Sequence, residues 1–531
     1  MKKLLKVLVV CLALALTLAG CGSNNNGGGT NEGGQTGGEN GGIPMDQTLI
    51  MVTSQDPQSF NPDFKSDDGA WPINQNIFNR LVKLGSKTSI NLDLAESYEF
   101  SEDGMTLTFH LHDGVKWHDG EPFTSADVKW TYDTAIAEKW AKADNLSNID
   151  SIECPDDNTV VMNLKYPDVS LIAKLSWYGT FIMPKHLYEG TDTATNEYNM
   201  KPVGTGPFKF VEFEKGVRVT LERNEDYWGD KAKLAKVIYS IIPDATTALQ
   251  AFKTGEVDYY TSIPTQNAND FDNDPNYEIF PVVGMNRSYI AANVSNDKFK
   301  DARVRQAIAY GIDRQMIWDR CAGGTGAVAS TFIAPNTGFA DEQYKMPERD
   351  VAKAQQLLEE AGFKKDANGI YFSTEMKFFE SGYFKDAATI IQSNLKEVGI
   401  DVKLTMMEYA AWGDTVKLNH DYELTMSAGY QGPDVSGVSG RVGTGTSMNF
   451  MEYSNLELDA LLEKGVQVSD ETERKAVYSE VQRIMSEEMP IILFMDNGAK
   501  VPVKKILKGT PYHEPTKASS AELTYVEFAA E

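Results

Sequence analysis

The chain of 531 residues is about three times as long as a common single domain, so it must fold into more than one lobe. Hydrophobic residues make up 41% of the chain and charged residues 24%, which excludes a disordered protein and one that crosses a membrane many times. The formal net charge of −26 opposes contact with phosphate backbones, so no nucleic-acid partner is expected.

Residues 1–20 have the features of an export signal. Three lysines precede an apolar run over residues 7–18, and small residues then lead to Cys21. The run is too short for a comfortable membrane span and no second long apolar segment follows, so the body is not expected to cross a bilayer. Residues 18–21 resemble the bacterial lipobox, which implies that Cys21 becomes the lipidated first residue of the mature protein. An ordinary signal peptide with an incidental cysteine is the alternative.

A low-complexity tether follows the lipobox. Residues 22–42 are almost all Ser, Asn, Gly, Thr, Gln and Glu, a composition that forms flexible coil and cannot bury a core. About twenty such residues have a root-mean-square reach of roughly 25 Å. We therefore expect residues 21–45, which comprise the lipidated Cys21 and the tether, to hold the body at the extracytoplasmic face of the bacterial cell membrane.

The body that begins near Thr48 alternates strands and amphipathic helices, which predicts an α/β fold. Residues 107–111 alternate as a half-buried strand, and tight turns are predicted at Gly114 and Gly120. Thr124 and Ser125 then precede a predicted helix over residues 126–132. Further helices are predicted over residues 351–361 and 387–398, each ended by a glycine, and residues 400–404 alternate as a strand.

The four cysteines are too few and too dispersed for a disulfide scaffold or a CxxC metal site. Cys11 lies in the export signal and should be removed with it. Cys154 and Cys321 are open to two interpretations, because an oxidising compartment permits a disulfide between them and burial favours two independent thiols.

Residues 109–128 closely resemble the signature of the family 5 extracellular solute-binding proteins, the receptors of peptide and nickel ABC importers. Further blocks at residues 202–210, 224–229, 248–258 and 301–314 are similar to the same family, in order, from about residue 48 to the C-terminus. Most signature residues are expected to be architectural. The glycines at 114, 120, 204 and 206 suit turns and close approaches, and Trp117, Phe123 and Trp228 suit a core.

The resemblance implies an α/β, two-lobed periplasmic-binding-protein-like fold of type II, in its large three-subdomain variant, with a hinged ligand cleft. The first lobe would comprise two subdomains over residues 46–295, completed by residues 490–531, and the second lobe residues 296–489. Such a receptor is expected to act as a monomer that captures peptides, with oligopeptides as the expected length class, and delivers them to permease subunits.

Two regions resemble the family's pocket, residues 58–82 and residues 429–434. In peptide receptors of this family an aspartate of the second region pairs with the ligand's α-ammonium group, and Asp434 is the matching position. Val435 stands where the family often has proline, and an exposed turn aspartate is the alternative. Residues 380–384 contain no arginine where dipeptide receptors bind the ligand carboxylate, which leaves longer peptides, modified peptides and neutral solutes open.

Aromatic side chains in and near these regions are candidate walls for the ligand, and a place in the core is the alternative for each. The candidate ligand-binding residues are Asp434, Tyr430, Trp412, Tyr383, Phe60, Asn61 and Trp71.

Three other functions are alternatives to peptide capture, an enzyme, a metal receptor and an oligosaccharide receptor. No GxSxG, HExxH or Walker A motif is present, so no catalytic residue and no cofactor are predicted. Receptors of the same family for nickel or a metal chelate are one alternative, but His110 and His112 lie in the signature block, where metal ligation is uncommon, and no metal site is predicted. An oligosaccharide receptor remains the other alternative.

Overall fold

The computed structural model describes residues 47–62, 67, 69–85, 89–141, 143–177 and 180–529. The export signal, Cys21 and the tether lie outside these residues. No helix among the described residues is both long enough and apolar enough to cross a membrane.

Two four-stranded sheets form the first half of the body, with strand orders β1-β10-β9-β8 and β4-β5-β7-β6. β1 pairs with β10 in parallel, and the other neighbours are antiparallel. The strands are β1 (Thr48–Thr53), β4 (Ala95–Phe100), β5 (Thr106–Leu111), β6 (Ile149–Asp156), β7 (Thr159–Leu164), β8 (Phe208–Glu214), β9 (Arg218–Arg223) and β10 (Lys236–Ile241). This part also contains β2 (Val82–Leu84), β3 (Ile90–Leu92), α1 (Trp71–Ile77), α2 (Ser125–Glu138), α3 (Leu171–Leu175), α4 (Lys185–Tyr188) and α5 (Ala245–Thr254). Near the C-terminus, β17 (Leu507–Lys508) and β18 (Glu527–Phe528) pair with each other and pack on the same core.

A six-stranded mixed sheet of order β12-β16-β11-β15-β13-β14 forms the other half. Its strands are β11 (Tyr277–Ala292), β12 (Ala327–Val328), β13 (Phe372–Phe379), β14 (Ile400–Met407), β15 (Leu424–Tyr430) and β16 (Ile491–Lys504). The helices packed around it are α6 (Ala302–Gly311), α7 (Arg314–Cys321), α8 (Val351–Glu360), α9 (Phe384–Val398), α10 (Tyr409–Trp412), α11 (Ser439–Val442), α12 (Leu456–Gln467) and α13 (Glu471–Glu488).

The buried side chains form two large cores, and these define two lobes. One core contains residues from Leu49 to Tyr259 and from Val501 to Val526, and we call its surroundings the N-terminal lobe. The other contains residues from Tyr289 to Met495 and defines the central lobe. A smaller cluster surrounds α5. The α/β, two-lobed fold class predicted from the sequence is confirmed.

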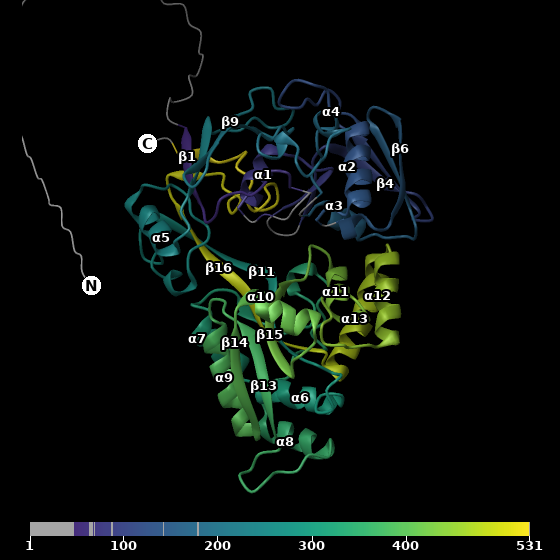
Figure 1. The fold of residues 1–531 in the computed structure, drawn as a ribbon, viewed down its shortest axis with the longest axis vertical. Coiled ribbons are helices and arrows are strands. Elements are labelled where there is room, and N and C mark those ends of the chain that lie inside the picture. The colour runs from purple at the N-terminus through teal and green to yellow at the C-terminus, as the bar shows by residue number, and fades with distance from the viewer. Residues whose placement is uncertain are drawn as a thin grey trace, which may run out of the picture. The chain divides into compact units, whose positions relative to one another are not determined.

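The strands β11 and β16 run from one lobe into the other as an antiparallel pair (Figure 1). Their register shifts between Val283 and Arg287, at the level where the surrounding core changes. Bulges bend and twist a strand pair, so this level is a natural position for a hinge. The lobe boundaries at residues 295 and 490 stay a prediction, and both fall on the central-lobe side of this level.

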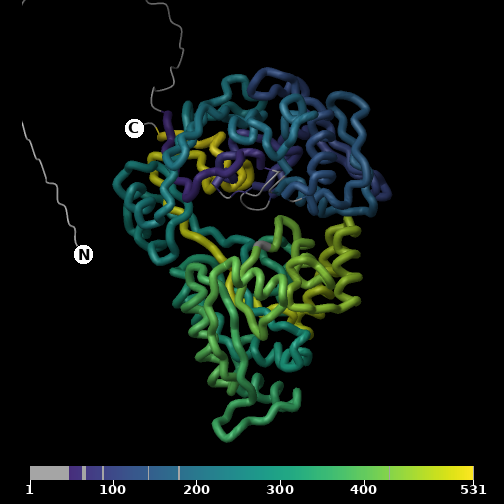
Figure 2. Tube along the Cα trace, in the orientation of Figure 1, coloured from purple at the N-terminus to yellow at the C-terminus, as the bar shows by residue number. Residues whose placement is uncertain are grey.

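The C-terminal stretch returns to the N-terminal lobe, beside segments from the start of the body (Figure 2). Asn76 of α1 fixes it there, since its Nδ2 donates to the Ala521 carbonyl at 2.9 Å and its Oδ1 accepts from the Leu523 amide at 2.8 Å. The N-terminal lobe is therefore assembled from both ends of the body.

The local predictions are confirmed with shifted ends. Thr124 and Asp127 form a reciprocal capping box at the start of α2, which continues to Glu138. The helix α9 begins earlier than predicted and ends at Gly399, whose φ of 103° is the left-handed conformation that glycine adopts without strain. The strand predicted at residues 400–404 is β14 and extends to Met407.

The signature blocks are architectural, as predicted, and two of them meet at His118. A Cβ on Gly204 would lie 1.9 Å from the Ile77 carbonyl oxygen, so only glycine fits there. The Gly204 amide donates to His118 Nδ1 at 3.2 Å, and His118 Nε2 lies 3.0 Å from the Gly206 carbonyl oxygen. Burial lowers the pKa of His118 to about 4, so this ring is neutral at pH 7.

The two cysteines of the body are both free in the structure. Cys321 is buried, and burial raises the pKa of its thiol to about 11. The sequence left a disulfide and two independent thiols open, and the structure shows two independent thiols.

Candidate functional site

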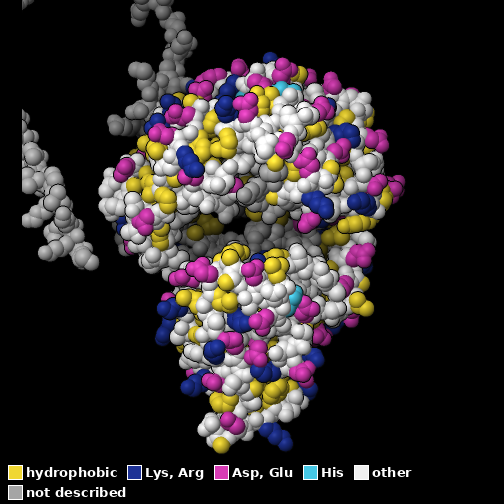
Figure 3. Space-filling view, in the orientation of Figure 1, with side chains coloured by type: hydrophobic (Ala, Val, Ile, Leu, Met, Phe, Trp, Pro, Cys, Tyr) yellow, Lys and Arg dark blue, Asp and Glu magenta, His cyan; other side chains and the backbone are white. Residues whose placement is uncertain are grey.

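A cavity of about 980 Å³ lies between the lobes, and we call it the interlobe cavity. Figure 3 shows the surface hollowed at this level. Its N-terminal-lobe wall consists of Asp144, Asn145, Ser147, Tyr166, Ala173, Lys174 and Trp177. Its central-lobe wall consists mainly of residues between 431 and 446, together with Asp459, Leu462, Glu463 and Val466 of α12. Both lobes are therefore needed to form it.

Asp434 lies in the central-lobe wall and forms an ion pair with Arg474 of α13. Arg474 donates Nη1 to Oδ2 at 2.9 Å and Nη2 to Oδ1 at 2.6 Å, and Oδ1 also accepts from the Ser436 amide at 2.9 Å. Burial raises the pKa of Asp434, but the hydrogen bonds and charge of Arg474 outweigh burial and leave the pKa below its ordinary value. The carboxyl group is thus ionised at pH 7.

The Asp434 side chain is 16% exposed, although it caps the short 3₁₀ turn at Val435–Val438. It is therefore a turn aspartate, as the alternative held, but not an exposed one. A carboxylate that faces a cavity from a mostly buried position interacts more strongly with a cation than one in open water does.

Gln431 adds a polar group to the same wall. Its side chain is 4% exposed, and its Nε2 has no hydrogen-bond partner among the described residues. Its backbone amide donates to the Met285 carbonyl at 3.0 Å, which ties this wall to β11. Across the cavity, Lys174 pairs with Asp168 at 2.6 Å. A ligand in the cavity would thus meet acidic and amide groups on both sides, and a lysine on the side of the N-terminal lobe.

The lobes touch beside the interlobe cavity, away from the strands that join them. The Val169 amide of the N-terminal lobe donates to the Val466 carbonyl at the end of α12, at 2.9 Å. These segments approach each other near α3 and α12 (Figure 1). The interlobe cavity is thus flanked by a direct interlobe hydrogen bond, while its described lining residues include none of β11 or β16.

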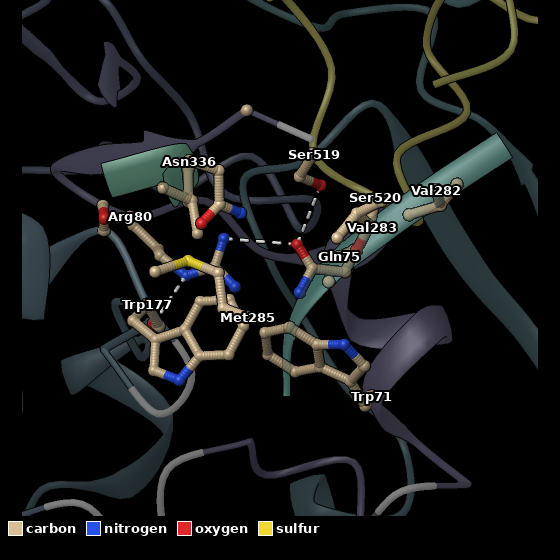
Figure 4. Close-up of a pocket in the computed structure, with 14 residues that line it drawn as sticks. Trp71, Gln75, Arg80, Trp177, Val282, Val283, Met285, Asn336, Ser519 and Ser520 are labelled. Carbon is tan, nitrogen blue, oxygen red and sulfur yellow. Dashed lines mark hydrogen bonds between the residues drawn. The ribbon is translucent and has the colours of Figure 1, made fainter. Parts of the chain in front are cut away.

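A second, smaller cavity of about 180 Å³ lies next to the strand pair, and we call it the hinge cavity. Indole rings of Trp71 and Trp177 line it, with centroids 6.1 Å apart, and Trp177 lines the interlobe cavity as well. The remaining lining residues are Gln75, Arg80, Leu84, Gly85, Ser176, Val282, Val283, Gly284, Met285, Asn336, Ser519 and Ser520. Figure 4 shows Arg80 and Gln75 side by side near the two indoles.

Arg80 lines the hinge cavity and is only 3% exposed. Several contacts hold its side chain in place. Its Nε donates to the Trp177 carbonyl at 3.1 Å and its Nη1 to Gln75 Oε1 at 3.3 Å. The guanidinium carbon lies 3.7 Å from the ring centroid of Phe181 and 5.4 Å from that of Trp71. Cation–π contacts of this kind stabilise a guanidinium that has lost water.

The structure places the predicted ligand-binding residues that it describes in the walls of the two cavities, beside the strands β11 and β16, or in the lobe cores. Asp434 lines the interlobe cavity and Trp71 the hinge cavity. Tyr383 lies beside the strands β11 and β16, where its hydroxyl is 2.5 Å from Ser288 Oγ and donates to Asn497 Oδ1 at 2.7 Å. The side chain of Tyr430 lies outside the described part of the structure.

Three of the predicted residues are in the lobe cores and line neither cavity. Trp412 is fully buried in the central lobe and donates Nε1 to Thr425 Oγ1 at 3.0 Å. Phe60 and Asn61 are fully buried in the N-terminal lobe, where the Phe60 ring packs against Phe210. For Trp412 and Phe60 the structure has the core position that was the alternative to a wall of the pocket.

Sequence reasoning did not single out Gln75, Arg80, Trp177, Gln431 or Arg474. Arg80 lies within the segment 58–82 that resembles the family's pocket, and Gln75 is four residues after Trp71 on one face of α1. These two could have been found from that segment. Arg474 lies forty residues after Asp434 in another element, and no sequence signal joins them.

The described residues contain no group of three or more His, Cys, Asp or Glu side chains placed to hold a metal ion. His112 lies against Trp228, with ring centroids 4.9 Å apart. His110 is on β5 of the N-terminal lobe. Neither histidine lines the interlobe or the hinge cavity.

Comparison with known proteins gives one family match. The model of the bacterial extracellular solute-binding proteins, family 5 Middle, matches residues 89–449, which is more than half of the chain.

Three similar proteins illustrate the range. The oligopeptide-binding protein AppA of Bacillus subtilis is 28% identical over 96% of both chains. Its solved structure, in complex with a nonapeptide, has a TM-score of 0.74 at 27% identity and covers 91% of this chain and 99% of that one. The ABC transporter substrate-binding protein CtaP of Listeria monocytogenes has a TM-score of 0.81 at 26% identity, with coverages of 91% and 99%. NikZ of Campylobacter jejuni, in complex with Ni(L-His), has a TM-score of 0.77 at 26% identity and the same coverages.

Proposed function

The chain belongs to family 5 of the bacterial extracellular solute-binding proteins, and we propose that it captures peptides outside the cell membrane and delivers them to the permease of an ABC importer. The observation that carries this proposal is the interlobe cavity of about 980 Å³, which both lobes line. Small-molecule pockets span roughly 300–1,000 Å³, so a ligand of several residues suits this volume. The similarity to AppA, whose solved structure holds a nonapeptide, supports a peptide as the cargo.

Asp434 is proposed to pair with the α-ammonium group of a peptide. Arg474 and the Ser436 amide donate three hydrogen bonds to the carboxylate, two at Oδ1 and one at Oδ2, and the Ser436 side chain bonds to it as well. An ammonium group in the interlobe cavity would be attracted by the charge of this carboxylate, which Arg474 keeps ionised and fixed.

The cargo is proposed to enter and leave unchanged, bound by a monomer that holds no cofactor. Nickel chelates and oligosaccharides are the alternative cargoes within the same family, and NikZ is a relative solved with a nickel–histidine complex. The test must therefore include all three classes.

A thermal-shift screen of the mature protein against di- to hexapeptides, oligosaccharides and nickel with histidine tests the proposal. A ligand present at a free concentration of 100 times its Kd stabilises the native state by about 2.7 kcal/mol, which raises the melting temperature by several degrees. We expect peptides to produce this shift and the other two classes to leave the melting temperature unchanged. A shift with nickel–histidine or an oligosaccharide, and none with any peptide, would replace the proposed cargo.

The anchor is proposed to be a lipid on Cys21, as the lipobox-like residues 18–21 imply. Replacing Cys21 with alanine should release the protein into the medium, because the remaining tether is polar and has no affinity for hydrocarbon. Fractionation of cells that express the wild type and the Cys21→Ala variant measures this. Ser23→Ala is the matched control and should stay with the membrane; membrane retention of the Cys21 variant would contradict the anchor.

A further inference from the structure

The hinge cavity contains a buried donor that the proposed function does not use. Gln75 is 6% exposed, and its Oε1 accepts from Arg80 Nη1 and from Ser519 Oγ at 3.0 Å. Its Nε2 has no hydrogen-bond partner among the described residues. Buried polar groups in native structures are nearly always paired, so an amide nitrogen that lines a cavity without an acceptor indicates that a ligand supplies one.

Arg80 places a positive charge next to this donor. Its contacts with the Trp177 carbonyl and Gln75 Oε1 hold the guanidinium in place, and the rings of Phe181 and Trp71 lie within cation–π distance of it. A guanidinium fixed in this way loses little side-chain entropy when it binds an anion. Arginine presents its N–H groups in a fork that matches the two oxygens of a carboxylate.

The charged side chain that lines the hinge cavity is a cation. Its described lining residues include Arg80 and no Asp or Glu. Asp93 and Glu522 line a smaller recess, which shares Gln75, Arg80 and Ser519 with the hinge cavity. There Glu522 pairs with Lys83 at 2.9 Å, and Asp93 accepts the backbone amide of Arg80 at 2.8 Å.

From this arrangement we infer that the hinge cavity is a carboxylate subsite, in which Gln75 Nε2 and the Arg80 guanidinium bind a carboxylate of the peptide between the indoles of Trp71 and Trp177. The inference rests on the proposed peptide-binding function and specifies its substrate class. The volume of about 180 Å³ admits one carboxylate with its short carbon stem, and not several residues.

Trp177 connects this subsite to the rest of the binding region, because it lines both cavities. A peptide whose amino end lies at Asp434 can therefore continue past Trp177 and place a carboxylate at Arg80. Asn336 of the central lobe lines the hinge cavity too, so the carboxylate would contact groups of both lobes. The carboxylate comes either from the C-terminus of the peptide or from an acidic side chain.

Retention of a peptide pool by the full-length mature protein tests the subsite. One pool contains random pentapeptides as free acids, a second the same pentapeptides as C-terminal amides, each with and without glutamate, and retained peptides are quantified by mass spectrometry. Preferential retention of free acids, by tenfold or more, supports a C-terminal carboxylate. Preferential retention of amides that contain glutamate supports an acidic side chain.

Variants of the subsite make the test specific. Gln75→Glu should reverse the preference for carboxylates because it places a negative charge beside the ligand, and Arg80→Gln should reduce it by tenfold or more. Arg320→Gln is the matched control, since it removes an exposed arginine that lines neither cavity. Thermal melts check that each variant is folded, and Gln75→Met replaces Arg80→Gln if the latter does not fold.

Equal retention of acids and amides, with and without glutamate, would overturn the carboxylate subsite and leave peptide capture intact. An unchanged preference for carboxylates in folded Gln75→Glu protein would also overturn it. Retention of no pentapeptide from either pool would contradict the proposed function, and the subsite with it.

Discussion

At the scale of single residues, Asp434 shows how far a sequence motif leads. The resemblance of residues 429–434 to the family's pocket located a carboxylate that the structure places in the wall of the interlobe cavity. The same reasoning proposed Trp412, which is fully buried in the core. An aromatic side chain suits a core and a pocket wall equally well, so residue type alone does not separate the two positions. A mostly buried ionised group needs a partner or a ligand, so a carboxylate indicates a binding site better than an aromatic side chain does.

The Asp434–Arg474 pair should stabilise the central lobe as well as bind a ligand. Replacing Asp434 with asparagine leaves the mostly buried Arg474 without its counter-charge, and breaking such a pair costs about 3–5 kcal/mol of unfolding free energy. Peptide affinity should fall by about tenfold or more, equivalent to about 1.4 kcal/mol per decade. Denaturant unfolding and calorimetry measure the two effects. The control is Asp421→Asn, whose carboxyl group is 80% exposed.

The difference in unfolding free energy between wild type and Asp434→Asn should depend on pH because the pKa of Asp434 is lowered. In the unfolded chain the carboxyl group titrates near its ordinary pKa of about 3.9, whereas in the folded protein it stays ionised to lower pH. Its stabilisation is therefore fully present above about pH 5 and is lost as the pH falls through the folded pKa. The stability gap between wild type and Asp434→Asn should shrink as the pH falls from about 5 toward 3. A gap that is constant over this range would contradict the assigned ion pair.

At the scale of elements, local patterns predicted the helices and strands whose ends are marked by caps and glycines. The start of α2 and the end of α9 follow directly from Thr124 and Gly399. The pairing of β11 with β16 could not be predicted in this way. These strands are separated by about two hundred residues of the central lobe, and their register is set by tertiary contacts and bulges rather than by any adjacent turn.

The loop that carries His118 should make stability depend on pH. Because burial lowers its folded pKa to about 4, below the ordinary value of about 6.5, the unfolded chain binds a proton between these values and the folded protein does not. The stability supplied by the neutral ring is therefore complete above about pH 6.5 and is lost as the pH falls toward 4, by on the order of 3 kcal/mol. In a His118→Gln variant the unfolding free energy should vary less over this range. Denaturant unfolding from pH 4 to 7 measures it, with the exposed His110→Gln variant as control; parallel curves for wild type and His118→Gln would refute the assignment.

At the scale of the whole body, the interlobe cavity depends on contacts that no single segment specifies. Its walls come from residues 144–177 on one side and 431–466 on the other, and the two strands that join the lobes lie elsewhere. The resemblance to a family predicted two lobes and a cleft between them. It did not specify which polar groups face the cleft, because Gln431 and Lys174 reach its walls only through the packing of complete lobes. The same packing brings Arg474 to Asp434.

If the lobes close around cargo, the protein should be more compact with a peptide than without one. A closed but empty cavity of about 980 Å³ would hold polar groups such as Gln431 Nε2 without partners, so in the absence of cargo an open arrangement lets water reach them. A bound peptide replaces that water and adds contacts to both lobes, which favours the arrangement with the Val169–Val466 hydrogen bond. Small-angle scattering of the mature protein should therefore show a smaller radius of gyration with peptide, and the Asp434→Asn variant should need about tenfold more peptide for the same change. Superimposable scattering profiles at saturating and zero peptide would mean that the two lobes and the strands β11 and β16 form one rigid body, and that capture does not involve closure.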